Sequence, residues 1–145
     1  MSPGSAHKTT LMDDAAFLQA FRSQQIAASD YNHRAHVRVA YLTLLELPFA
    51  AALAAMRDGI KALNASHGLV ETPDRGYHET LTRAWLTLIH SAIRSRGRAD
   101  TFEAFAVEHP HLLCRTCLRL FYSQSGMPPH SRYEWVEPDL TPLPS

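Results

Sequence analysis

Histidine is the most unusual feature of this chain, since nine of its 145 residues are histidine in a sequence otherwise rich in alanine and leucine. His33 and His36 stand three residues apart in DYNHRAHVRVAYLTLLEL (30–47), and His78 begins HETLTRAWLTLI in a second apolar segment, 77–89. Residues at this spacing share one helical face. Buried imidazoles that converge are costly unless something shared satisfies their lone pairs, and a divalent metal does so. We therefore predict a mononuclear metal held by His33, His36 and His78.

Such a site favours an enzyme as the first hypothesis. Three nitrogen ligands suit zinc, copper, iron or nickel, and ligand type alone does not choose among these metals. The metal would act as a Lewis acid or oxidant on a small molecule, and the positive ends of two helices favour an anionic one. The residues expected to transfer protons are Glu79, Tyr77 and Tyr41. The residues expected to contact the substrate are Arg75, Tyr31 and Trp85.

Two further hypotheses stay open. The protein is then either a non-catalytic module that binds a metal or a small ligand, as a sensor or chaperone does, or a metal-free helical interaction protein. In the second case the histidines form a hydrogen-bonded polar network. Glu79 also has an ordinary explanation, because an acidic residue in the first turn of a helix complements the helix dipole.

The motif CRTC contains both cysteines, Cys114 and Cys117. A CxxC pair can be a redox couple or half of a zinc site. Here the pair lies within an apolar stretch that reads as helical, whereas a redox pair normally has its first cysteine at a helix start. The sequence therefore favours packing in the core for both cysteines.

Composition limits the partners. Fourteen basic residues balance fourteen acidic ones, so no strong field indicates a nucleic-acid or membrane partner. The apolar runs are too short to span a bilayer, and the first residues show no secretory signal. Two cysteines are too few for a disulfide scaffold, which fits a cytoplasmic protein. We expect a small-molecule ligand or substrate. The sequence does not determine the oligomeric state.

The elements that must position these residues are helices. Residues 1–12 have no hydrophobic period and are expected to form a flexible arm, and residues 13–145 a single helical domain. Caps and periodicity predict a first helix from Asp13 or Asp14, and further helices at 30–47, 48–68, 77–96, 100–108 and 110–123. The proline-rich tail, 124–145, should be extended and packed on the bundle. The fold class is thus an all-α bundle of five or six helices.

Topology brings the three histidines together. Short connections make neighbouring helices antiparallel, so the helices at 30–47 and 77–96 should run in the same direction. Their first turns then lie at one end of the bundle. This places His33, His36 and His78 in a shared layer.

Several segments resemble a family of small bacterial proteins. They are NHRAHVRVAYLTL (32–44), YHETLTRAWLTLI (77–89), LFYSQ and WVEPDLTPLP. The resemblance covers most of the chain after residue 12. It implies a helical domain whose signature includes His33, His36, His78 and Glu79, in a family that is uncharacterised and to which no activity is attached.

Overall fold

A computed structural model describes residues 12–145, so the predicted arm at 1–12 lies, Met12 excepted, outside the described residues. The α-helices of this part are α2 (Asp14–Arg22), α3 (His33–Glu46), α4 (Phe49–Ser66), α5 (Glu79–Arg96) and α6 (Phe102–Glu108). Five short 3₁₀ helices accompany them: η1 (Ala28–Asp30), η2 (Pro110–Leu113), η3 (Arg115–Leu120), η4 (Gln124–Gly126) and η5 (Pro129–Arg132). Residues 12–145 contain no strand, and the all-α prediction is confirmed.

The helix starts follow from capping side chains. The Asp13 carboxylate accepts the Ala16 N–H at 2.7 Å, and the Asn32 side-chain oxygen accepts the Ala35 N–H at 2.9 Å. Both bonds satisfy backbone donors that the first turn of a helix leaves unpaired. At the far end of α4, Gly68 has a positive φ of 73°, as a left-handed closure after a helix requires.

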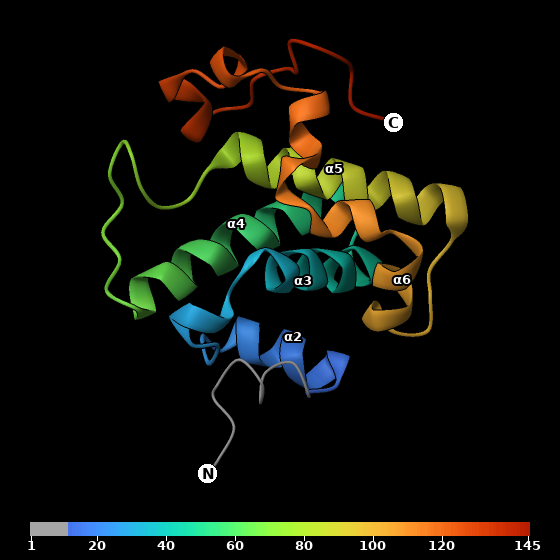
Figure 1. Cartoon of the computed structure of the whole chain (residues 1–145). Coiled ribbons are helices and arrows are strands. Elements are labelled where there is room, and N and C mark those ends of the chain that lie inside the picture. The colour runs from blue at the N-terminus through green and yellow to red at the C-terminus, as the bar shows by residue number, and fades with distance from the viewer. Residues whose placement is uncertain (1–11) are drawn as a thin grey trace.

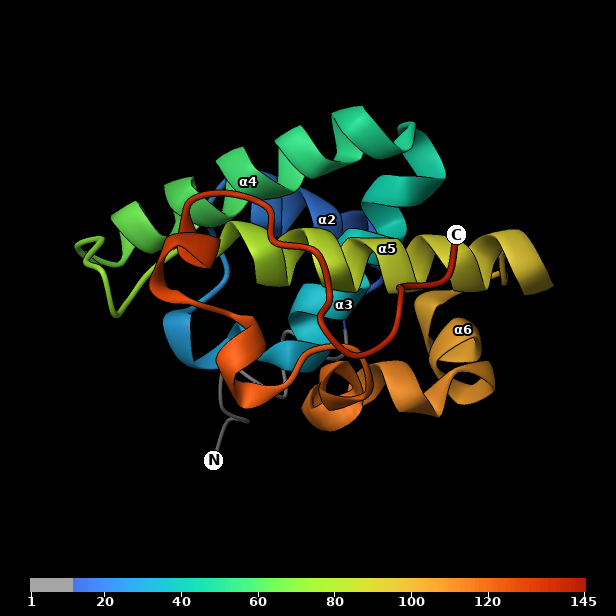
Figure 2. The same cartoon turned by 90° about the horizontal axis from the view of Figure 1, so that it is seen from above.

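Helix α3 is the centre of the bundle, because α2, α4, α5 and α6 all contact it. Val37, Val39 and Tyr41 are completely buried. Helices α3 and α5 run in broadly the same direction and α4 runs the opposite way, as the short connections predict (Figures 1 and 2). Within residues 12–145 no helix has both the length and the hydropathy that crossing a membrane requires.

The predicted α-helix at 110–123 was wrong. Cys114 has an extended backbone, φ −100° and ψ 114°, and separates η2 from η3. Each short helix buries one leucine, Leu112 or Leu118, in place of a continuous apolar stripe. Cys114 is exposed and Cys117 is partly buried, so only Cys117 packs as the sequence predicted.

The C-terminal segment lies across α5 (Figure 2). The Thr80 hydroxyl, on α5, donates to the Glu134 carbonyl at 2.8 Å and accepts the Val136 N–H at 3.1 Å. The Arg83 guanidinium lies over the Trp135 ring, 4.4 Å from its centre. These contacts hold residues 134–136 against the bundle.

Candidate functional site

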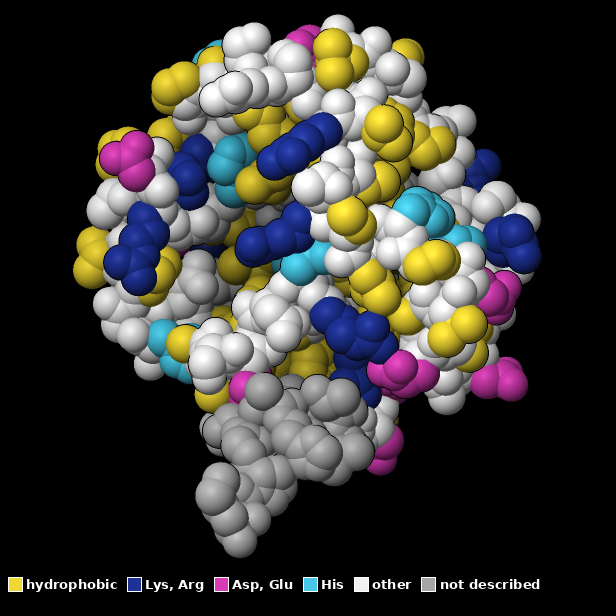
Figure 3. All heavy atoms as spheres, in the orientation of Figure 1, with side chains coloured by type: hydrophobic (Ala, Val, Ile, Leu, Met, Phe, Trp, Pro, Cys, Tyr) yellow, Lys and Arg dark blue, Asp and Glu magenta, His cyan; other side chains and the backbone are white. Residues whose placement is uncertain are grey.

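A cavity of about 1000 Å³ opens between the first turns of α3 and α5 and the segment that follows η2. In Figure 3, histidine and arginine or lysine side chains gather around hydrophobic ones near the centre of this face. The lining residues are Tyr31, Asn32, His33, His36, Ile60, Gly76, Tyr77, His78, Leu81, Thr82, Trp85, Arg115, Leu118, Arg119, Tyr122, Ser123, Gln124 and Met127. The three histidines singled out in the sequence therefore face one cavity.

His33, at the start of α3, is hydrogen-bonded to the backbone of η2. Its Nε2 lies 2.9 Å from the Leu112 carbonyl oxygen, and its ring centre lies 4.5 Å from that of Trp85. Because a carbonyl only accepts, Nε2 carries the proton in this bond. Burial lowers the pKa of His33, and the positive charge of Arg115 adds to this effect.

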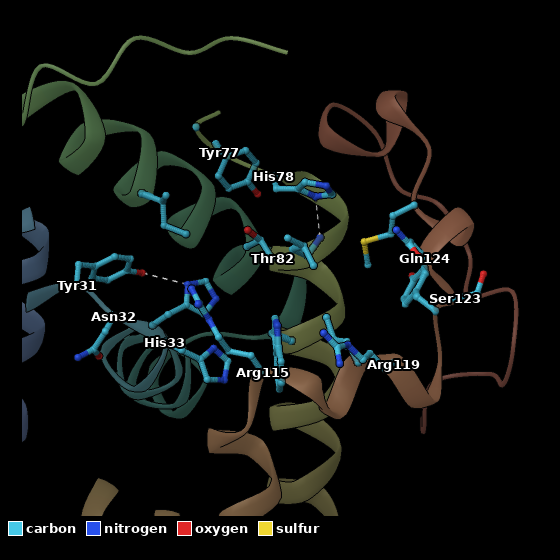
Figure 4. A pocket seen from close by; sticks show the side chains of 18 residues that line it. Tyr31, Asn32, His33, Tyr77, His78, Thr82, Arg115, Arg119, Ser123 and Gln124 are labelled. Carbon is cyan, nitrogen blue, oxygen red and sulfur yellow. Dashed lines mark hydrogen bonds between the residues drawn. The ribbon is translucent and has the colours of Figure 1, made fainter. Parts of the chain in front are cut away.

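His36, one turn further along α3, is paired with Tyr31. The Tyr31 hydroxyl lies 3.2 Å from Nδ1 of His36 (Figure 4, dashed line). Burial raises the pKa of Tyr31, so the phenol stays protonated. Burial also lowers the pKa of His36 to about 4, so its ring is neutral near neutral pH. Either group can donate in this bond: the phenol donates when the ring proton of His36 is on Nε2, and the ring donates when its proton is on Nδ1.

His78 is the N-cap of α5 and precedes the helical stripe that the sequence assigned it to. Its Nδ1 accepts the Leu81 N–H at 3.1 Å. Burial lowers the pKa of His78, and the charge of Arg132 acts in the same direction. A neutral ring that accepts through Nδ1 has its proton on Nε2, so the other edge of His78 is a hydrogen-bond donor.

These bonds bear on the predicted metal. A metal ligand must offer a lone pair, yet the lone pair of His78 at Nδ1 already accepts the Leu81 N–H, and Nδ1 of His36 is engaged with the Tyr31 hydroxyl. His33 uses its Nε2 proton on a backbone carbonyl. Within residues 12–145 no group of three His, Cys, Asp or Glu side chains is arranged to hold a metal ion. The three rings share a cavity without converging on a single point.

Glu79 is turned away from the histidines. Arg57 binds its carboxylate through two nitrogens, at 2.9 and 2.8 Å, and the Tyr77 hydroxyl donates to it at 2.8 Å. It lines a separate cavity of about 270 Å³ with Arg57 and Tyr77. The bond from Arg57 holds the pKa of Glu79 below its usual range, which makes this carboxylate a weak base. Burial and the bond to Glu79 raise the pKa of Tyr77.

Two other predicted residues do not reach the cavity. Tyr41 is completely buried, and its hydroxyl donates to the Ala99 carbonyl at 3.1 Å and accepts the Ala99 N–H at 3.0 Å. It stands five residues after His36, about 140° further around the helix, and so faces α6. Arg75 is exposed in the turn before α5 and lines neither cavity. Tyr31, Tyr77 and Trp85 do line the larger cavity.

Sequence reasoning missed the second wall. Arg115 and Arg119 come from η3, and Ser123 and Gln124 follow it (Figure 4). The four-residue spacing of Arg115 and Arg119 could have indicated a shared basic surface, but the segment was predicted to be a helix packed in the core. Neither arginine forms an ion pair with any acidic residue among 12–145, and no aspartate or glutamate lines the cavity. The cavity is therefore rich in donors and positive charge.

Comparisons with protein families, curated proteins and solved structures find no match to this chain. The resemblance to a family of small bacterial proteins stays a prediction.

Proposed function

We propose that the larger cavity binds a small organic anion. The observation that carries this proposal is the lining: three histidines and two arginines surround the cavity, and no acidic side chain offsets them. This corresponds to the small-ligand binding module among the hypotheses from the sequence.

The charge of the ligand would be met by Arg115 and Arg119. Both side chains are exposed at the rim, and an arginine without an acidic partner is a strong site for a carboxylate or phosphate. The Nε2–H group of His78 adds a neutral donor. The first turns of α3 and α5 contribute the positive ends of two helix dipoles, which also favour an anion.

The rest of the ligand would be apolar and flat. Trp85, Leu118 and Tyr122 are buried residues that present apolar surface to the cavity, and Leu81 and Met127 extend it. A pocket of mainly apolar walls with a few convergent polar groups is the usual form of a small-molecule site. An aromatic carboxylate or phosphate ester combines both requirements.

The test uses the fluorescence of Trp85. Trp135, the other tryptophan, is replaced by phenylalanine so that one reporter remains. Benzoate and phenyl phosphate are titrated into this variant, with benzyl alcohol as the neutral probe of similar shape. We expect a saturable change for the two anions and none for the alcohol. Equal binding of the alcohol would overturn the proposal, because affinity would then not depend on charge.

Substitution of the arginines tests the same proposal at the residues that carry it. Arg115→Gln and Arg119→Gln should each weaken binding about tenfold, as expected for the loss of a charged hydrogen bond. Arg94→Gln, at an exposed position near the end of α5, is the matched control and should bind as the parent does. Unchanged affinity in the Arg115→Gln/Arg119→Gln double variant would contradict an anion site here.

A metal-dependent enzyme is the second candidate, and the observation that favours it is that His33, His36 and His78 all line one cavity. Metal binding through Nε2 of His78 would require its proton to move to Nδ1, which breaks the cap to Leu81. Elemental analysis of freshly purified, untagged protein tests this candidate, after zinc, copper, iron and nickel are each offered. About one metal per chain, lost in both His33→Ala and His78→Ala, would favour the metal over the anion.

A further inference from the structure

Cys114 and Cys117 lie in a turn that suits a disulfide. The Cys117 N–H donates to the Cys114 carbonyl at 3.0 Å, which closes a four-residue turn. The ends of such a turn have Cα atoms within about 7 Å, and a disulfide joins Cα atoms about 4.4 to 6.8 Å apart. The turn therefore brings the Cα atoms of the two cysteines within the range that a disulfide can bridge.

The two thiols differ in accessibility and in reactivity. Cys114 is exposed, and its Sγ lies 2.9 Å from the Thr116 hydroxyl. This hydrogen bond, with a contribution from the charge of Arg119, holds the pKa of the Cys114 thiol below its usual range. Cys117 is partly buried against the core, and burial raises its pKa. Cys114 is thus the better nucleophile and Cys117 the better resolving group.

The structure removes the reason for which the sequence argued against a redox pair. The sequence placed both cysteines in the middle of an α-helix that buries them. In the structure Cys114 instead precedes the first residue of η3, Arg115, with an extended backbone and an exposed sulfur. A first cysteine at a helix start with its partner three residues later is the arrangement that redox pairs use.

We propose that Cys114 and Cys117 form a reversible intramolecular disulfide, which acts on the cavity through η3. A peroxide is the oxidant. The Cys114 thiolate attacks one peroxide oxygen and breaks the O–O bond, giving a sulfenic acid and, after protonation, water. The Cys117 thiol then attacks the Cys114 sulfur and expels a second water. Two thiols and one hydrogen peroxide thus yield one disulfide and two waters.

The disulfide would alter the wall that carries the two cavity arginines. Arg115 lies within the four-residue loop that the bond closes, and Arg119 follows it in the same short helix. Closing the bond also removes the contact between Cys114 and Thr116. We expect the oxidised protein to bind the anionic ligand differently from the reduced protein, and this second step rests on the proposed function.

The test of the disulfide needs no ligand. The full chain is treated with hydrogen peroxide, its remaining thiols are alkylated, and the intact mass is measured before and after reduction by dithiothreitol. We expect a monomer that has lost two hydrogen atoms, takes up no alkyl group, and regains two alkylation sites on reduction. Further oxidation without a disulfide, or a covalent dimer as the main product, would overturn the proposal.

Variants separate the roles of the two cysteines. Cys117→Ser should accumulate the sulfenic acid at Cys114, trapped by dimedone, whereas Cys114→Ser should react slowly. Thr116→Val keeps both thiols and should slow alkylation of Cys114 at neutral pH. Equal reactivity of the two thiols would contradict the assigned order of attack. Circular dichroism of each variant confirms that the helices are retained.

The ligand experiment is then made on both redox states. Benzoate is titrated into the reduced and the oxidised Trp135→Phe protein. A change in affinity of severalfold or more supports coupling to the cavity. A disulfide with equal affinity in both states overturns the coupling alone, and a disulfide without any benzoate binding overturns the proposed function while the redox pair stands.

Discussion

His78 uses its two ring nitrogens for two tasks. Nδ1 caps α5 by accepting the Leu81 N–H, and the Nε2 edge belongs to the cavity lining. Asparagine is among the best capping residues but lacks the reach and the ring donor of histidine. A pair of substitutions therefore separates the structural task from the binding task.

We predict that His78→Asn keeps the stability of the protein and weakens anion binding. His78→Ala should weaken binding and also lower the free energy of unfolding by about 0.5 to 2 kcal/mol, because the cap is lost. Urea unfolding and Trp85 fluorescence measure the two effects. A His78→Asn variant that binds benzoate as tightly as the parent would show that the ring edge makes no contact with the ligand.

His36 should make stability depend on pH. Burial lowers its pKa in the folded state to about 4, below the 6.5 of an ordinary histidine. Between these values the unfolded chain binds more protons than the folded one, so the free energy of unfolding falls as the pH falls through this window. The loss due to His36 reaches about 2 kcal/mol by about pH 5, at 1.36 kcal/mol per pKa unit.

The measurement is urea unfolding at about pH 7 and about pH 5. His33, His78 and His109 have pKa values shifted in the same direction, so the contribution of His36 is the difference between the parent and His36→Asn. His130→Gln, at an exposed position, is the control and should follow the parent. An identical loss in the parent and in His36→Asn would show that His36 does not titrate as its burial requires.

At the scale of elements, α2 and α4 approach each other through a glycine. Gly59 lies on α4 where a Cβ atom would overlap the Phe21 ring of α2. Alanine is the better helix former, so helix propensity alone predicts that Gly59→Ala stabilises the protein. Packing predicts the reverse.

We expect packing to decide, with Gly59→Ala destabilising the protein by about 1 to 3 kcal/mol. In the background of Phe21→Leu the same substitution should cost less, because the smaller side chain leaves room. A double-mutant cycle by thermal unfolding measures this coupling. Additive effects would mean that the two positions do not meet.

The elements also show where sequence reasoning succeeds. Helices α3 and α5 were predicted because their apolar periods are local signals, and their common direction followed from short connections. Their starts differ from the prediction, since α3 begins at His33 and not at residue 30, and α5 at Glu79 and not at residue 77. The apolar residues of the 110–123 segment recur at a helical spacing, but the segment forms the short 3₁₀ helices η2 and η3. The two short helices each bury one leucine, Leu112 or Leu118, and the extended Cys114 between them is not visible in the hydrophobic pattern.

The same distinction applies to the cavity. The wall formed by the histidines was predictable, since His33 and His36 lie in the first turns of α3 and His78 caps α5. Their ring orientations were not, because these depend on Tyr31, on the Leu112 carbonyl and on the capping of α5. The position of Arg115 and Arg119, which form the arginine wall of the cavity, depends on the path that the chain takes after α6.

At the scale of the molecule, the Thr80 side chain helps to hold the C-terminal segment on the bundle. The Thr80 hydroxyl is fully buried and bonds both the Glu134 carbonyl and the Val136 N–H. We predict that Thr80→Val keeps the shape of the side chain, loses both bonds, and lowers the free energy of unfolding by about 1 to 2 kcal/mol.

Limited proteolysis should show which segment becomes less stable in Thr80→Val. Cleavage within 123–145 should be faster in Thr80→Val than in the parent. Thr87→Val is the matched control, because the Thr87 hydroxyl bonds only the Arg83 carbonyl of its own helix. Equal cleavage of the two variants would mean that Thr80 does not hold the segment.

The histidines and the arginines of the cavity are also synthesised at different times during translation. Translation proceeds from the N-terminus, and the histidine wall is complete once residue 85 has been added, whereas the arginine wall ends only at Met127. A nascent chain that stops before η3 has the three histidines but not the two arginines. On the proposed function, an anion would therefore stabilise chains that extend past Met127 and not chains that stop before η3.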